Sequence, residues 1–255
     1  MPLASWIVCT HYRDQLLDAC LQTLHDAVWP AGWEHEIVVG CHEDDVRGQT
    51  VAMMRGAKIA TTRGKNPGPK KNAALAASHG ELVLSTDDDD MQSPMRPRLA
   101  VEAYEEGWKV SGIREFRYLH LENGHVVRWC GRGTAMRGSK VARDMPPVFV
   151  GTARNYKRSL LMSMNAWKYI PSLVEKDLQG RIAHRYGAEA KEKDLGIELA
   201  NTTICVQHGS NIWGDRPCVP RGKEVIRGNY ILVGEGHWSD VPGFPPVVAE
   251  RLGLS

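Results

Sequence analysis

The chain has 255 residues, of which 42% are hydrophobic and 24% charged, and its 32 lysines and arginines nearly balance 30 aspartates and glutamates. This composition is typical of a folded globular chain and excludes disordered, collagen-like and coiled-coil proteins. No stretch approaches the ~18 consecutive apolar residues of a membrane-spanning helix, and no basic segment precedes the short apolar run at the N-terminus. We therefore expect neither a membrane span nor secretion.

The six cysteines are scattered along the chain without any C-x-x-C pair. This pattern favours a reducing compartment, so we expect a cytoplasmic protein. Cys205, His208 and Cys218 are the only plausible zinc ligands, but they lack the paired spacing of structural zinc sites. We expect no structural zinc.

The first half of the chain alternates between strand-like and helix-like segments. Short apolar runs predict strands, and apolar residues that recur every three or four positions predict helices. In chain order the pattern predicts a strand at 6–9, a helix at 13–24, strands at 36–40 and 58–61, a helix at 70–78 and a strand at 81–86. Such alternation predicts an α/β fold with parallel strands, whose ligands gather at the carboxyl ends of those strands.

The second half has a different character. An Asn-Gly pair between two strand-like arms predicts a β-hairpin over 117–129, because these residues accept the positive φ angles of a tight turn. Helical patterns follow at 157–167 and 173–186, and a last strand is predicted at 202–206. Neither an internal repeat nor a low-complexity linker divides the chain, so we expect a single domain.

Four successive aspartates, 87–90, end the strand predicted at 81–86. Four ionised carboxylates repel one another, and a divalent cation is the simplest way to neutralise them. Their hard oxygen ligands suit Mg²⁺ or Mn²⁺. The alternative interpretation is a solvated acidic turn.

Two lysines, Lys70 and Lys71, follow a Gly-Pro loop and begin the helix predicted at 70–78. The free N–H groups and the dipole of a helix N-terminus favour an anion there. The loop is not a P-loop, because G-x-x-x-x-G-K-[ST] is absent. These lysines indicate either an anion site or an ordinary basic surface loop.

The combined stretch 68–94 resembles the donor-binding core of family-two glycosyltransferases of the GT-A type. It contains, in order, a Gly loop, a basic residue followed by Asn, a helix of small residues, Gly-Glu, an apolar strand, Asp-x-Asp-Asp and a proline. The resemblance implies a GT-A fold: α/β, with a Rossmann-like, mostly parallel central sheet flanked by helices, and a β-hairpin and helices on the acceptor side. Residues 1–107 would form the donor-binding half and residues 108–255 the acceptor-binding and catalytic half of one domain.

The same resemblance implies an enzyme that moves a sugar from a nucleoside-diphosphate sugar to a hydroxyl acceptor, with Mn²⁺ or Mg²⁺ bridging the diphosphate to the aspartates. Carried over by position, the implied donor-binding residues are Thr10, Tyr12, Arg13, Lys70, Lys71, Asn72, Asp87 and Asp88. The implied metal ligands are Asp87, Asp89 and His208. Family members commonly carry an acidic pair after the second strand, where this chain has Gly40-Cys41-His42. UDP-sugar is the default donor, and the base remains open.

The family places a catalytic carboxylate at the start of a later helix, where this chain has Glu175 and Asp177. Such a base removes the proton of the acceptor hydroxyl, and inversion requires it on the face opposite the leaving diphosphate. Ser172 followed by Glu175 is also a capping-box pattern, which predicts that the Glu175 side chain turns back to the backbone. We therefore prefer Asp177 as the base and keep Glu175 as the alternative.

The segment 128–185 contains twelve basic and three acidic residues. This asymmetry favours a polyanionic acceptor, for example a hydroxylated base in DNA, with Arg154, Lys157 and Arg158 as acceptor-binding residues. An anionic cell-surface glycan or a lipid-linked phosphate is an alternative acceptor, and the surface could also be basic without any polymer partner. A non-catalytic nucleic-acid-binding protein is the alternative from a different class, although no such motif is present.

Overall fold

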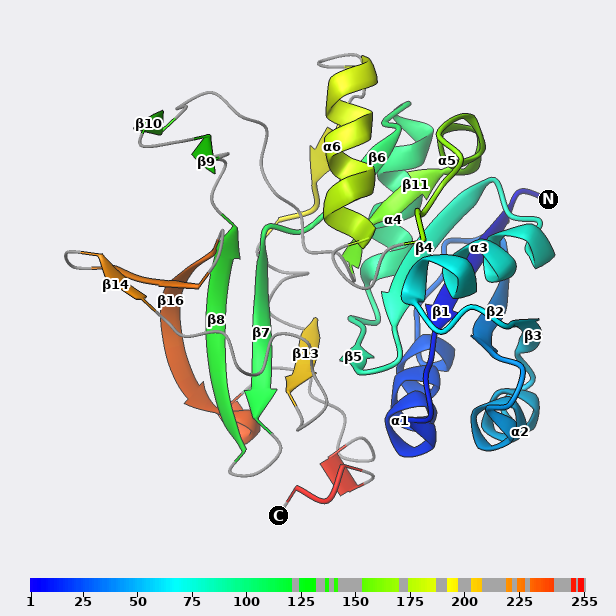
Figure 1. Ribbon diagram of the computed structural model, residues 1–255, viewed down its shortest axis with the longest axis horizontal. Coiled ribbons are helices and arrows are strands. Elements are labelled where there is room, and N and C mark those ends of the chain that lie inside the picture. Colours follow the sequence, from blue (N-terminus) through cyan, green and yellow to red (C-terminus); the bar gives the residue numbers. More distant parts are fainter. Residues whose placement is uncertain are drawn as a thin grey trace.

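The structure, a computed structural model, describes residues 1–120, 124–131, 136–137, 140–141, 153–169, 174–186, 192–196, 203–207, 219–221, 224–227, 230–240, 249–250 and 252–254. Within these residues, the strands form two seven-stranded sheets and a short ribbon of β9 (Met136–Arg137) and β10 (Lys140–Val141). The two large sheets lie side by side (Figure 1). No helix in this part of the chain is long and apolar enough to cross a membrane.

The first sheet has the strand order β12-β6-β11-β4-β1-β2-β3. Its strands are β1 (Leu3–Cys9), β2 (Glu34–His42), β3 (Lys58–Thr62), β4 (Leu82–Asp87), β6 (Val110–Gly112), β11 (Asn155–Lys157) and β12 (Glu192–Asp194). β3, β2, β1 and β4 run parallel, whereas β11 is antiparallel to both β4 and β6. The predicted α/β fold with a mostly parallel central sheet is confirmed. Both predicted halves of the chain contribute strands to this sheet.

Helices cover both faces of the first sheet. They are α1 (Asp14–His25), α2 (Val46–Met54), α3 (Pro67–Ala77), α4 (Arg96–Glu105), α5 (Arg158–Ser163) and α6 (Val174–Tyr186). Successive side chains of a strand point to opposite faces, so Trp6 and Val8 of β1 pack with α1, α2 and α4, while Ile7 packs with α3, α5 and α6. This arrangement leaves the carboxyl ends of β1, β2 and β4 free to carry polar groups.

The observed helices differ from the predicted ones at identifiable positions. α3 begins at Pro67, three residues before the prediction, because proline is tolerated in the first helical turn. α5 ends at Ser163, because Asn165 and Ala166 adopt positive φ angles that end the helical path. The sequence patterns did not predict α2 or α4.

The second sheet has the strand order β14-β15-β16-β8-β7-β13-β5. Its strands are β5 (Asp90–Met91), β7 (Glu115–His120), β8 (His125–Gly131), β13 (Ile204–Gln207), β14 (Val219–Arg221), β15 (Glu224–Arg227) and β16 (Tyr230–His237). β7 and β8 pair antiparallel, as the predicted hairpin requires, and Gly124 has a φ of 66°, whereas Asn123 of the predicted turn lies outside the described residues. A short 3-10 turn, Trp238–Asp240, follows β16. Because β5 pairs with β13, the two sheets meet beside the aspartate run.

Candidate active site

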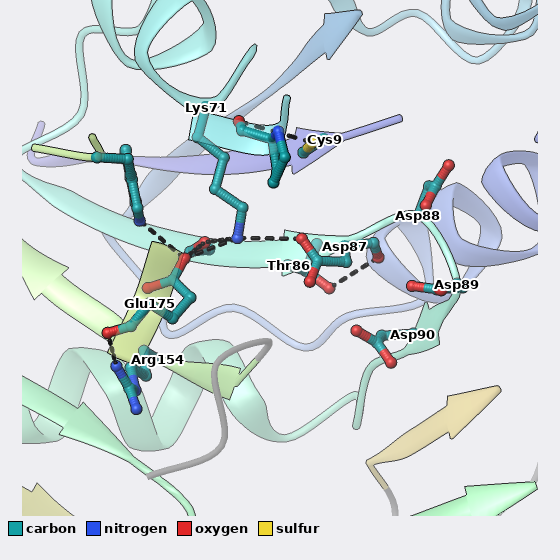
Figure 2. Close-up of polar contacts among 12 residues, drawn as sticks. Cys9, Lys71, Thr86, Asp87, Asp88, Asp89, Asp90, Arg154 and Glu175 are labelled. Carbon is teal, nitrogen blue, oxygen red and sulfur yellow. Dashed lines mark hydrogen bonds and ion pairs between the residues drawn. The ribbon is translucent and has the colours of Figure 1, made fainter. Parts of the chain in front are cut away.

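The four aspartates leave β4 at its carboxyl end, as predicted, but their side chains have different surroundings (Figure 2). Asp87 ends β4, and its Oδ1 lies 3.0 Å from the ammonium nitrogen of Lys71. Asp90 belongs to β5 and pairs with Cys205 of β13. The backbone carbonyl of Asp89 accepts a 2.8 Å hydrogen bond from the N–H of Val206. The aspartate run is therefore held between the two sheets.

Asp88 is fully buried and joins this run to the end of β1. Its Oδ2 accepts hydrogen bonds from the Thr10 hydroxyl at 2.6 Å and from Nε of Arg13 at 3.1 Å. Arg13 also forms an ion pair with Oδ1 of Asp88 and lies 2.7 Å from Oδ2 of Asp89. Burial raises the pKa of Asp88 to about 7, although the charge of Arg13 opposes this shift. The structure thus brings Thr10 and Arg13, both predicted for the donor site, to the aspartates.

Lys71 is the central cation of the site. Its ammonium lies between Asp87 and Glu175 (Figure 2), 2.7 Å from Oε1 of Glu175 and 3.1 Å from the hydroxyl of Ser85. The side chain is 1% exposed, and these two carboxylates hold its pKa above the ordinary value despite burial. A buried charge requires such partners. Lys71 therefore connects the strand that carries the aspartates to the start of α6.

Glu175 is buried and accepts several hydrogen bonds. Besides Lys71 and Ser85, its donors are the Trp167 indole N–H at 2.8 Å and the Tyr156 hydroxyl at 2.7 Å. Burial acts to raise the pKa of Glu175, but the charge of Lys71 outweighs it, and the pKa is lowered. The capping-box prediction is wrong for this side chain, because these donors draw the carboxylate into the site. Ser172 lies outside the described residues.

Asp177, the preferred base of the sequence analysis, has other neighbours. Its carboxylate accepts a 2.8 Å hydrogen bond from Arg181 and lies 3.4 Å from the ammonium of Lys168. It lines an open groove of about 630 Å³ between α5 and α6, together with Met164 and Arg185. Of the two predicted carboxylates, only Glu175 shares a cation with Asp87.

The remaining predicted donor residues lie around α3 and the end of β1. The side-chain amide of Asn72 forms two hydrogen bonds with the backbone of Trp167. It donates to the carbonyl at 2.6 Å and accepts from the N–H at 3.1 Å. Tyr12 adopts a φ of 55°, and its ring is exposed and lies 4.7 Å from the ring of His11. Lys70 is buried at the first turns of α3. Asn72 thus holds the segment before α6, whereas Tyr12 and Lys70 face the ends of β1 and β2.

The donor set for a divalent cation fits the carboxylates of Asp87 and Asp89. No group of three His, Cys, Asp or Glu side chains suited to a metal exists within the described ranges, and His208 lies outside them. Mg²⁺ sites commonly use one or two protein carboxylates, with phosphate oxygens and waters completing the shell. The side chain of Asp87 is 38% exposed and that of Asp89 13% exposed, so both reach the surface of the site.

The three predicted acceptor-binding residues do not form an open basic surface beside the aspartates. Arg154 is buried and donates to the backbone carbonyl of Glu175 at 2.6 Å. Lys157 pairs with Leu82 at the amino end of β4, five residues before Asp87, which corresponds to about 16 Å along a strand. Arg158 follows it and donates to Ser78 and to the carbonyl of Leu75. Two of the three therefore lie at the opposite end of the sheet.

Several residues that shape the site were not predicted from the sequence. They are Ser85, Tyr156, Trp167 and the buried Arg96. Arg96 donates to the backbone carbonyls of Ser85 and Arg154, at 2.8 Å and 2.9 Å, and so fastens β4 to β11. A charged residue directly before Pro97 at a helix start is the one sequence signal for Arg96, and it is a weak one.

Comparison with known proteins supports the fold. No protein-family model matches the chain, and no curated protein matches its sequence. Among solved structures, it is similar to glucosyl-3-phosphoglycerate synthase from Mycobacterium tuberculosis in complex with Mn²⁺, UDP and glucosyl-3-phosphoglycerate. The TM-score is 0.54 with 16% identity, over 77% of this chain and 71% of that one.

Two further solved structures show the same similarity. The mannosyltransferase PcManGT from Pyrobaculum calidifontis, in complex with GDP-Man and Mn²⁺, has a TM-score of 0.54 with 13% identity, over 80% of this chain and 56% of that one. A fragment of TarS from S. aureus in complex with UDP has a TM-score of 0.50 with 19% identity, over 82% and 59%. The chain thus spans less than two thirds of these two proteins. The predicted GT-A fold is confirmed.

Proposed function

We propose that this protein is a metal-dependent glycosyltransferase that moves a sugar from a nucleoside-diphosphate sugar to a hydroxyl acceptor. The observation that carries the proposal is the bridge from Asp87 through Lys71 to Glu175 at the carboxyl end of β4. Ligands of open parallel sheets bind at this edge. The similar structures with GDP-Man and Mn²⁺ or UDP and Mn²⁺ support the same donor class.

Asp87 and Asp89 are the residues that would hold Mn²⁺ or Mg²⁺, with His208 as a further ligand. The metal would neutralise negative charge on the diphosphate leaving group. Arg13 holds Asp88 and Asp89 in place, and Lys71 holds Asp87. These residues keep the carboxylates apart from one another and oriented before the donor binds.

Glu175 is the better placed of the two candidate bases. It is linked to Asp87 by one ammonium group, whereas Asp177 is paired with Arg181 in the groove between α5 and α6. The lowered pKa keeps Glu175 ionised near neutral pH, as a proton acceptor must be. An inverting transfer would place the acceptor hydroxyl between this carboxylate and the donor sugar.

The decisive test measures release of the nucleoside diphosphate from a panel of UDP-, GDP- and CDP-sugars with Mn²⁺ or with EDTA. Asp89→Ala should reduce the metal-dependent release to background, because one of two metal-binding carboxylates is lost. The matched control is Glu81→Gln, whose carboxylate contacts Tyr104 at the amino end of β4. Undiminished, EDTA-resistant release by Asp89→Ala would refute the proposal.

The same assay can identify the class of molecule that carries the acceptor hydroxyl group. Plain DNA, DNA with hydroxymethylated cytosine and an anionic glycan should be offered in turn across a salt series. Binding through about six phosphates would weaken by ~10³-fold between low and moderate salt. The placement of Lys157 and Arg158 away from the aspartates gives DNA no particular support as the acceptor.

A further inference from the structure

Lys70 is a buried lysine for which the structure provides no partner. The residue is 1% exposed, yet its ammonium forms neither a hydrogen bond nor an ion pair with any described residue. Burial lowers the pKa of this group. An ammonium that is largely withdrawn from water and has no protein partner is suited to receive a partner from a ligand.

The position of this ammonium follows from its electrostatic effects. Burial is the main cause of the lowered pKa of His11, and the charge of Lys70 lowers it further. Burial raises the pKa of Cys41 to about 11, and the charge of Lys70 opposes that rise. Cys9 responds to Lys70 in the same sense as Cys41. These residues lie at the ends of β1 and β2, the corner of the sheet that α3 approaches at Gly40.

Close packing brings Lys70 to this corner. A Cβ atom on Gly40 would overlap the backbone carbonyl oxygen of Lys70 and lie 3.3 Å from Cβ of Ala74. Only glycine allows α3 to approach β2 so closely. The absence of a side chain at Gly40 therefore allows α3 to place Lys70 against β2.

The two carboxylates whose charges act on Lys70 have other partners. Asp45 accepts from the N–H groups of Tyr12 and Gly48, at 2.8 Å and 3.0 Å, and caps α2. Asp88 is held by Thr10 and Arg13. No described residue thus forms an ion pair with Lys70 at this corner.

Aromatic rings border the same corner. The exposed ring of Tyr12 lies between those of His11 and His42, with centroid distances of 4.7 Å and 6.4 Å. β2 and β4 are separated only by β1, so their ends lie about 10 Å apart. If the diphosphate binds at Asp87 and Asp89, the corner with Tyr12 and Lys70 is where the base would lie, since bases stack on aromatic rings.

We propose that Lys70 is a specificity-determining residue that reads the donor base, and that this base presents a ring nitrogen and a carbonyl oxygen side by side as acceptors. Guanine offers N7 and O6, and cytosine offers N3 and O2. Uracil places an N–H between its two carbonyls, and adenine pairs N7 with an amino group. An ammonium therefore favours guanine or cytosine at this corner. This inference rests on the proposed donor class.

The test measures, by calorimetry on the full chain with MnCl₂, the affinities for UDP, CDP, GDP, ADP and inorganic pyrophosphate. Wild type should bind CDP or GDP at least about 10-fold more tightly than UDP and ADP, as expected for one charge-assisted hydrogen bond. Lys70→Met should remove that preference, with a loss of about 10- to 100-fold for the preferred nucleotide. Pyrophosphate, which has no base, should bind equally to both proteins.

A stability measurement separates a recognition role from a structural one. Without ligand, Lys70→Met should not lower the melting temperature, because the apolar side chain has a similar length and no hydrogen bond or ion pair with a described residue is lost. Lys58→Met, which removes a lysine paired with Glu36 at the amino end of the sheet, is the control and should change neither preference nor pyrophosphate binding. Lys70→Gln serves as a second variant should Lys70→Met fail to fold.

Three outcomes would overturn the inference. Tighter binding of UDP than of CDP and GDP by wild type would show that the preferred base does not present a ring nitrogen and a carbonyl oxygen side by side as acceptors. An equal loss for every nucleotide and for pyrophosphate would show that Lys70 contacts phosphate instead. Unchanged affinities in Lys70→Met would show that Lys70 does not contribute to nucleotide binding. Absence of binding by wild type to all five probes would instead refute the proposed donor class itself.

Discussion

The two ends of the first sheet carry similar charged residues in different arrangements. At the amino end, Glu36 accepts from the ammonium of Lys58 at 2.6 Å and from the hydroxyl of Ser5 at 2.7 Å. At the carboxyl end, Lys71 joins Asp87 to Glu175. The lysine side chain is 54% exposed in the first case and 1% exposed in the second.

This difference separates surface stabilisation from function. An ion pair gains less from its Coulomb attraction when one partner is exposed, as Lys58 is, because water screens it. A buried network costs desolvation energy and is retained where it serves a site. We therefore expect the carboxyl end, and not the amino end, to be the ligand-binding end of the sheet.

The largest expected effect distinguishes the two carboxylates of α6. Glu175→Gln should lower turnover by ~10²–10⁴, as removal of a positioned base typically does, with donor affinity nearly unchanged. Asp177→Asn is the matched variant and should lower turnover far less, because Asp177 pairs with Arg181 outside the bridge. Steady-state rates with saturating donor measure both. A larger loss in Asp177→Asn would restore the prediction made from the sequence.

The next effect concerns the buried cation that fastens the carboxyl end of β4. Arg96→Met should destabilise the protein by about 3 kcal/mol, because the carbonyls of Ser85 and Arg154 lose a buried donor. Arg98→Met removes an exposed pair with Glu102 and should cost less than about 0.5 kcal/mol. Urea unfolding measures both values. Equal effects would remove the distinction between buried and exposed charges.

The position of the aspartates at the end of β4 could be predicted from the sequence because its information is local. Residues 68–94 contain a loop, a helix start, a strand and the aspartates in one continuous run. The strands β1 to β4 were predicted for the same reason, since each is a short apolar run between polar residues. α2 was missed although Asp45 stands at its N-cap, because its apolar residues follow no clear helical period.

The surroundings of Glu175 and the place of Lys157 could not be predicted, because their contacts join distant segments. Lys71 and Glu175 are 104 residues apart, and a capping-box pattern gave Glu175 a local explanation instead. The number of basic residues in the segment 128–185 indicated its net charge but not where those residues lie in the fold. β11 enters the sheet antiparallel to β4, which places Lys157 opposite Leu82 rather than near Asp87. β14, β15 and β16 were likewise not predicted, although β15 pairs with both of its neighbours in sequence.

A smaller effect tests whether Arg158 belongs to the acceptor site or to the amino end. Its guanidinium donates to the hydroxyl of Ser78 at 2.7 Å and to the carbonyl of Leu75 at 2.9 Å. Arg158→Ala should therefore destabilise the protein by about 1–2 kcal/mol while leaving acceptor affinity unchanged. Thermal unfolding and acceptor titration measure the two quantities. Weaker acceptor binding without a loss of stability would support the role predicted from the sequence.

The smallest expected effect is a pH dependence at the amino end. Burial alone would raise the pKa of Glu36, but hydrogen bonds from Lys58, the His79 N–H and Ser5 outweigh it and lower the pKa to about 2. A carboxylate with a lowered pKa in the folded state contributes stability above its unfolded pKa, and the contribution disappears as the pH falls through the folded pKa. The window thus runs from an ordinary value of 4.5 down to about 2.

Glu36→Gln isolates this contribution from those of the other carboxylates. At neutral pH the variant should be less stable than wild type, and the difference in melting temperature should shrink as the pH is lowered from 5 towards 2.5, because wild type alone loses the ionised group. Catalytic turnover at neutral pH should stay at the wild-type value, since the cluster lies at the end of the sheet opposite the aspartates. A difference in melting temperature that stayed constant with pH would show that Glu36 acts through packing and not through its charge.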